Sequence, residues 1–139
     1  MSEANKARLR RFYDEVFNKG NLAVMDEMAV ANFVDHNPSP GQLPGLEGVK
    51  QMFAAMRTAL PDMRVTVEDM VAEGDKVAAH VTLRATHGGE FMGIAPTGRG
   101  ITARIADIVR FADGKAVERW GVEDMSDLLQ ALGVSSPPQ

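Results

Sequence analysis

A chain of 139 residues with a net charge of −4 and no cysteine is long enough for one domain with a sizeable core. The mild acidity argues against a nucleic-acid partner, because phosphate binding needs a clustered basic surface, and the lack of cysteine excludes disulfides, thiolate nucleophiles and cysteine-bound zinc. No apolar run reaches the ~20 residues of a membrane span, and the first ten residues lack the apolar core of a secretory signal. We therefore expect a cytoplasmic protein with no membrane partner.

The first sixty residues predict three helices. Apolar residues recur at helical spacing in the first of them, at Leu9, Phe12, Tyr13, Val16 and Phe17. A short second helix is predicted over 22–29, and the loop 33–45, "FVDHNPSPGQLPG", follows it. The third helix places Val49, Met52, Phe53, Met56 and Leu60 on one face and is closed by Pro61.

After Pro61 the hydrophobic period changes from 3.6 to 2, which indicates strands. Two strands within 63–87 turn at "EGDK", a third covers 101–111, and a fourth, "AVERWGVED" (116–124), returns after the turn "ADGK". A short helix over 125–133 and a frayed tail, 134–139, end the chain. This order predicts a single α+β domain over 1–139, with the helices on one face of a curved antiparallel sheet.

One carboxylate breaks the alternation of the third strand. The odd positions of 101–111 are apolar except for Asp107, which therefore projects from the apolar face. Burial of a carboxylate is costly unless it is paired or protonated, and burial can also prepare it for proton transfer. Functionally, Asp107 is either a general acid or base or a group that orients a neighbouring histidine. Structurally, it is either half of a buried ion pair with an arginine or a residue at a strand edge that solvent reaches.

The histidines give two weaker candidates. His36 lies in "VDHNP" and is either an acid/base group or a loop cap, and His87 is placed where the apolar face of a strand meets a loop. The three histidines show no metal-ligand spacing, so no metal site is predicted. "AVERWGVED" adds the sole tryptophan, Trp120, with Arg119 and Asp124 close to it in sequence.

The chain resembles the SnoaL-like polyketide cyclases, or ester cyclases, of the NTF2-like superfamily. The resemblance lies in the order of its segments, which begin with "FVDHNP" and end with "THGGEFMGIAPTGRGITARIADIVRFADGKAVERWGVEDMSDLLQALG". The resemblance runs from about residue 7 to residue 133. It implies a cone in which a strongly curved antiparallel sheet wraps around the N-terminal helices and a deep apolar pocket. It also implies a homodimer or higher homo-oligomer, and ring closure by aldol condensation without metal or cofactor.

The resemblance also assigns residues. The family position of a histidine linked to the acid/base group is Asp107 here, and the principal acid/base aspartate falls at Gly121. Asp124 matches an acidic position of the motif, and His36 matches a histidine common in simpler members.

We expect a cofactor-free acid/base enzyme acting on a small apolar carbonyl compound, of cyclase, isomerase or hydrolase type. Asp107 would be the base, His36 its partner across the pocket, and Asp124 a carboxylate at the rim. Trp120 would form an aromatic wall, with Arg119 or His87 polarising the ligand. The alternative is a non-catalytic small-molecule-binding or assembly module, which the glycine at position 121 favours.

Overall fold

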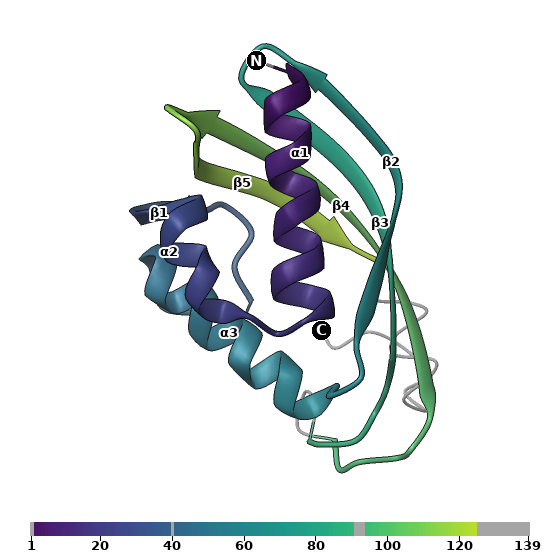
Figure 1. Cartoon of the computed structure of the whole chain (residues 1–139). Coiled ribbons are helices and arrows are strands. Elements are labelled where there is room, and N and C mark those ends of the chain that lie inside the picture. Colours follow the sequence, from purple (N-terminus) through teal and green to yellow (C-terminus); the bar gives the residue numbers. More distant parts are fainter. Residues whose placement is uncertain (1, 40, 91–93, 125–139) are drawn as a thin grey trace.

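The computed structural model describes residues 2–39, 41–90 and 94–124. In this part of the chain, α1 (Ser2–Phe12) runs along the concave side of a bent five-stranded sheet, with α2 (Met25–Met28) and α3 (Gly45–Ala59) beside it (Figure 1). The strand order is β1-β5-β4-β3-β2. The architecture is α+β, as predicted, and it agrees with the cone of the NTF2-like fold.

The predicted first helix forms with its apolar stripe buried, but its last turns are wider than an α-helix. α1 continues into a π-helical segment, η1 (Tyr13–Asn18), followed by a hydrogen bond from the Lys19 N–H to the Asp14 carbonyl at 3.0 Å. The buried ring of Phe17 packs edge-on against Phe53 of α3, with ring centroids 4.9 Å apart. Such contacts fix the helices to each other above the sheet.

The predicted second helix is only partly regular. A 3₁₀ turn, η2 (Leu22–Val24), precedes the single turn of α2. The prediction of a loop over 33–45 is wrong at its start, because residues 33–35 belong to a strand, β1 (Ala29–Asp35). β1 hides only Ala29 and Phe33, and its register with β5 is irregular, so its sequence "AVANFVD" carries no clear period of 2.

The two predicted hairpins are confirmed. The strands are β2 (Arg64–Glu73), β3 (Lys76–Thr86), β4 (Gly100–Ala112) and β5 (Lys115–Glu123). Positive φ angles at Asp113 (51°) and Gly114 (81°) form the tight turn between β4 and β5. These four strands are antiparallel, but β1 pairs in parallel with β5, which makes the sheet mixed rather than purely antiparallel.

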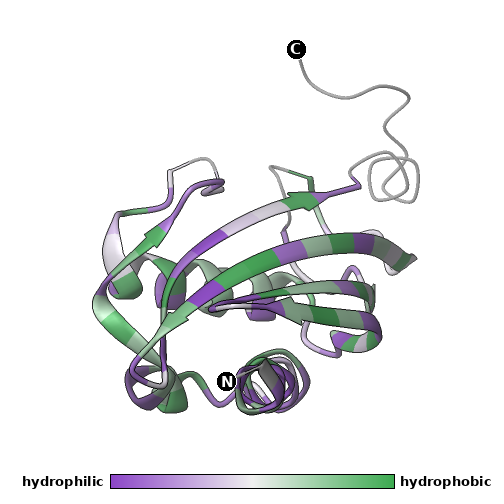
Figure 2. Cartoon of the chain, turned by 90° about the horizontal axis from the view of Figure 1, so that it is seen from above, coloured by the Kyte–Doolittle hydropathy of each residue, from purple (hydrophilic) through white to green (hydrophobic). Residues whose placement is uncertain are grey.

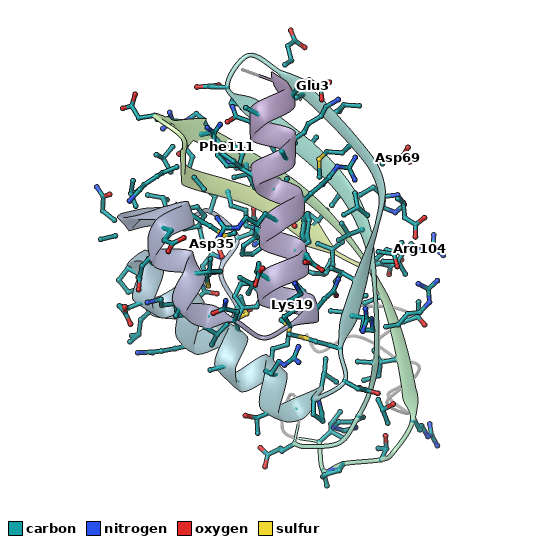
Figure 3. All side chains as sticks on the ribbon, viewed as in Figure 1. Glu3, Lys19, Asp35, Asp69, Arg104 and Phe111 are labelled. Carbon is teal, nitrogen blue, oxygen red and sulfur yellow. The ribbon has the colours of Figure 1, made fainter. Side chains whose placement is uncertain are left out.

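The sheet has one apolar face and one mixed face, and Figure 2 shows the resulting alternation of hydrophilic and hydrophobic residues along the strands. The odd positions of β4 are buried beneath the helices, including Asp107 with 7% exposure. Asp69 and Arg104 project from the outer side, turned away from α1 (Figure 3). The predicted helix over 125–133 and the tail 134–139 lie outside the described residues. Among the described helices, none combines the length and the apolar character that a membrane crossing requires.

Candidate functional site

A cavity of about 230 Å³ lies between the helices and the concave face of the sheet. Most of its wall is apolar, because the inward stripes of the helices and the buried positions of the sheet meet there. Its apolar lining consists of Leu9, Phe12, Phe17, Met25, Met28, Ala29, Phe33, Leu46, Val49, Met52, Phe53, Met56, Ile105, Val109, Phe111 and Ala116. Such a wall suits the body of a small organic molecule.

Charged side chains form one polar wall of this cavity. Asp107 comes from the middle of β4, Arg119 and Glu123 from β5, and Asp35 from the end of β1. We call these four side chains the polar cluster. Strand pairing brings them together, because Asp35 lies opposite Arg119 and Asp107 lies opposite Gly121.

Asp107 is held at both carboxylate oxygens. The buried hydroxyl of Tyr13 donates to Oδ2 at 2.6 Å, and Arg119 donates from Nε to Oδ1 at 2.9 Å, with Nη2 at 2.8 Å from the same oxygen. Burial, together with the nearby charge of Asp107, raises the pKa of Tyr13 well above its usual range. Tyr13 is therefore a neutral donor that fixes the carboxylate from behind.

Arg119 is the centre of the polar cluster, and acceptors surround its guanidinium. Besides Asp107, Nη1 contacts Asp35 Oδ1 at 3.1 Å and the carbonyl oxygen of Asn37 at 3.4 Å, and Nη2 contacts Glu123 Oε1 at 3.0 Å. Burial alone would lower the pKa of Arg119, but the carboxylates of Asp107 and Asp35 raise it above its ordinary value. Each of the three nitrogens of this guanidinium therefore donates to a protein acceptor.

Gly121 provides the space that this arrangement needs. A Cβ at position 121 would overlap the guanidinium of Arg119 and lie 2.7 Å from Asp107 Oδ1. Positions 119 and 121 share one face of β5, so the arginine can fold over the glycine to reach the carboxylate opposite. The missing side chain at 121 is thus what allows the Asp107–Arg119 ion pair to form.

Of the six site residues predicted from the sequence, the structure brings only Asp107 and Arg119 together in the cavity. His36 and Trp120 lie on the outer face of the sheet, where their rings stack with centroids 4.7 Å apart and planes at 5°. His36 Nε2 lies 2.9 Å from Glu118 Oε2, and Lys76 Nζ lies 5.3 Å from the centroid of the Trp120 ring. Neither ring is part of the cavity wall.

The other two predicted residues lie apart from the cavity. His87 is fully buried, and its Nδ1 lies 3.1 Å from Thr97 Oγ1 and accepts from the Thr97 N–H at 3.3 Å. Asp124 is exposed at the end of β5, and its N–H donates to the carbonyl of Arg104 at 2.8 Å.

The sequence reasoning missed Tyr13, Asp35 and Glu123 as members of the site. Tyr13 belongs to an apolar helical stripe that predicts a buried core position. The sequence does not indicate where its hydroxyl group is directed. Asp35 would have been found if β1 had been assigned, because a period of 2 places it on the same face as the buried Phe33. Glu123 lies on the same face of β5 as Arg119 and Gly121. The alternation of side chains along this strand would therefore have placed Glu123 beside Arg119.

Three carboxylates and one guanidinium, −3 and +1, leave the polar cluster with a formal charge of −2. Two of the carboxylates are nearly inaccessible, since the side chains of Asp35 and Asp107 are 6% and 9% exposed. The arrangement therefore holds two buried carboxylates beside an apolar wall, with one guanidinium between them. Among the described residues, no group of three or more acidic or histidine side chains is arranged to hold a metal ion.

The fold and this cavity define a small α+β protein with an internal, mostly apolar cavity. Residues 7–132 match the family model of the SnoaL-like polyketide cyclases, and the chain belongs to this family. Among curated proteins, none matches the chain significantly in sequence.

Solved structures show the same fold over nearly the whole chain. IdmH from Streptomyces antibioticus, described as a candidate polyketide cyclase, is 35% identical with a TM-score of 0.80, and the alignment covers 93% of this chain and 98% of that one. AclR from Streptomyces galilaeus, described as a candidate hydroxylase, is 31% identical with a TM-score of 0.83, covering 95% and 96%. TsrD from Streptomyces laurentii is 25% identical with a TM-score of 0.86, covering 94% and 96%.

Proposed function

We propose that this protein is a cofactor-free acid/base enzyme that removes a proton next to the carbonyl group of a small apolar compound. The observation that carries the proposal is the excess of buried carboxylate over cation at the wall of an apolar cavity. A proton transferred from carbon to this cluster lowers its excess negative charge, so the surroundings favour a base over an acid. The similarity to IdmH, a candidate cyclase, and to AclR, a candidate hydroxylase, supports a carbonyl or aromatic polyketide-like compound.

In the proposed step, Asp107 is the base. The C–H bond of the ligand breaks, its proton passes to Asp107, and the bonding electrons move onto the carbonyl oxygen to give an enolate. Return of the proton from Asp107 to another carbon completes an isomerisation. In a ring closure, the enolate carbon forms a bond to a second carbonyl carbon of the same molecule, the π electrons of that carbonyl move onto its oxygen, and the resulting alkoxide takes the proton back from Asp107. Tyr13 and Arg119 hold the carboxylate in place and do not contact the reacting carbon.

Donors for the enolate oxygen come from the loop after β1. Ser39 and Gln42 both line the cavity, and Gln42 Nε2 donates one hydrogen bond to Asp35 Oδ2 at 3.1 Å. Its second N–H and the Ser39 hydroxyl are suited to a developing negative charge. Arg119 is poorly suited to this role because its N–H groups already face protein acceptors.

The proposal predicts exchange of carbon-bound hydrogen. Deuterium incorporation into 2-tetralone, a small bicyclic ketone, is followed by NMR in D₂O with the full chain present. We expect Asp107→Asn to lower the protein-dependent rate by about 10²–10⁴-fold, the usual size of a general-base contribution. Asp14→Asn, the same change at an exposed position of η1 that does not line the cavity, is the matched control and should leave the rate unchanged. Exchange at the wild-type rate in Asp107→Asn would refute the assignment of the base.

The alternative is a non-catalytic binding module with the same cavity. It is favoured by the firm fixation of Asp107, since both of its oxygens already accept hydrogen bonds. A wild-type protein that binds 2-tetralone but adds nothing to the background rate of exchange would decide for this alternative.

We also propose that the outer face of the sheet pairs with a second copy of the chain. Val71, Ile108 and Val122 are 65%, 42% and 67% exposed there, around a hollow of about 430 Å³. Apolar side chains gathered on one face favour contact with another surface over contact with water. Val122→Glu should lower the mass measured by analytical ultracentrifugation to that of a monomer. An unchanged mass would refute this interface.

A further inference from the structure

The polar cluster offers hydrogen-bond acceptors to a ligand and almost no donors. The guanidinium of Arg119 is directed at Asp35, Asp107, Glu123 and the backbone of the loop that follows β1. The Tyr13 hydroxyl is likewise directed at Asp107. An anionic ligand would have to displace one of these internal partners before it could bind the only cation of the cluster.

Free acceptor positions remain on two carboxylates. Among the described residues, Glu123 is engaged at Oε1 alone, so Oε2 is open, and its side chain is 44% exposed. Asp35 accepts from Arg119 and the Asn37 N–H at Oδ1 and from Gln42 at Oδ2, which leaves one further acceptor position on Oδ2. A ligand that supplies a hydroxyl or ammonium donor would satisfy these oxygens.

Charge points in the same direction as hydrogen bonding. The cluster carries a formal charge of −2, of which the buried Asp35, Asp107 and Arg119 contribute −1 and the half-exposed Glu123 the rest, so a carboxylate brought beside it is repelled at short range. The two other cations of the wall come from α1. Arg11 lies 3.4 Å from Glu27, which also lines the cavity, and Arg8 Nη1 donates to the neutral Asn5 Oδ1 at 2.6 Å. With these side chains included, −4 and +3, the wall as a whole has a formal charge of −1.

We propose that this cavity takes an uncharged or cationic apolar compound that donates a hydrogen bond to Glu123 and Asp35, and that it rejects carboxylates of the same shape. The inference rests on the proposed function only in taking this cavity as the substrate site. The volume of about 230 Å³ lies below the usual range of about 300–1,000 Å³ for drug-sized ligands, which suits a compound of one or two rings.

Four naphthalenes with different substituents at position 2 test this proposal by isothermal titration calorimetry on the full chain. 2-Naphthol and 2-(aminomethyl)naphthalene supply a neutral and a cationic donor, 2-methoxynaphthalene supplies no donor, and 2-naphthoate is an anion. We expect both donors to bind at least tenfold more tightly than the methoxy compound and 2-naphthoate to bind most weakly. Binding of 2-naphthoate as tight as that of 2-naphthol would overturn the proposal.

The variant Glu123→Gln tests whether the polar cluster causes the preference for hydrogen-bond donors over carboxylates. This half-exposed side chain tolerates an isosteric change, and circular dichroism confirms the fold of the variant. We expect the ratio of the dissociation constants of 2-naphthoate and 2-naphthol to fall at least threefold. Glu73→Gln, the same change at an exposed end of β2, is the control. An equal ratio in the two variants would contradict the role of Glu123.

These measurements are independent of turnover. Donor preference without deuterium exchange into 2-tetralone would refute the acid/base function and leave the ligand class standing. Exchange that depends on Asp107, combined with equal binding of 2-naphthoate and 2-naphthol, would refute the ligand class alone.

Discussion

Replacement of Arg119 by methionine tests the view that one guanidinium neutralises the buried part of the polar cluster. Methionine keeps most of the length and the packing of the stem but removes the charge. Asp35 and Asp107, with 6% and 9% of their side chains exposed, would then face each other without a cation. Loss of one partner of a buried ion pair costs about 3–5 kcal/mol, because the remaining charge is left desolvated.

For a domain of this size, about 4 °C of melting temperature corresponds to 1 kcal/mol, so we expect a drop of roughly 12–20 °C. Urea unfolding followed by circular dichroism gives the free energy directly. The matched control is Arg110→Met, which breaks the pair with Glu118 on the outer face, where the arginine side chain is 35% exposed. Such pairs contribute about 1 kcal/mol or less.

Equal losses in Arg119→Met and Arg110→Met, both below about 1 kcal/mol, would refute the reasoning. A second measurement separates charge from packing. Combination of Arg119→Met with Asp107→Asn should cost less than the two single changes added together, with a coupling of about 1–3 kcal/mol. Strict additivity would show that the arginine acts through packing alone.

Three further predictions follow from the same contacts. Tyr13→Phe leaves one oxygen of a buried carboxylate without its donor and should lower the free energy of unfolding by about 1.5–3 kcal/mol, measured in urea. Gly121→Ala should lower the free energy of unfolding by about 1–3 kcal/mol, because the added methyl group overlaps the guanidinium of Arg119. The same change should cost clearly less in the Arg119→Met variant, which has no guanidinium. The hydrogen bonds of Glu118 to His36 and Arg110 lower the pKa of its carboxyl group. The contribution of Glu118 to the stability of the fold is therefore complete above the ordinary glutamate pKa, and it is lost as the pH falls through the lowered value. Glu118→Gln should therefore flatten the acid limb of stability below about pH 5, and an unchanged limb would contradict this account.

The hydrophobic periodicity of the sequence predicted the helices and strands in which buried and exposed residues alternate regularly. The alternation in 101–111 placed Asp107 on the buried face, and the structure has it there. The same rule could not place β1, since only Ala29 and Phe33 are hidden in that strand and its pairing with β5 is bulged. Parallel pairing at a sheet edge depends on contacts with a strand more than eighty residues away, which local sequence does not encode.

The error in β1 propagated into the candidate site. With residues 33–45 taken as a loop, His36 was free to be placed opposite Asp107, whereas strand parity turns its side chain outward and turns Asp35 inward. Trp120 follows the same rule, because Asp107 is paired with Gly121 and the neighbouring position must face the other way. The charged residues of "AVERWGVED" thus divide between the two faces of the sheet.

Gly121 shows why a family position without its usual side chain does not by itself mean a lost site. The resemblance places an acid/base aspartate at 121, but here the space above that residue holds the guanidinium of Arg119. The arginine can occupy it only because no Cβ is present, and from there it joins the carboxylate of β4 to that of β1. An aspartate at 121 would compete for the same volume and add a fourth negative charge to the cluster. Glycine and arginine two residues apart are therefore one structural unit, which moves the candidate base from β5 to Asp107 on the neighbouring strand.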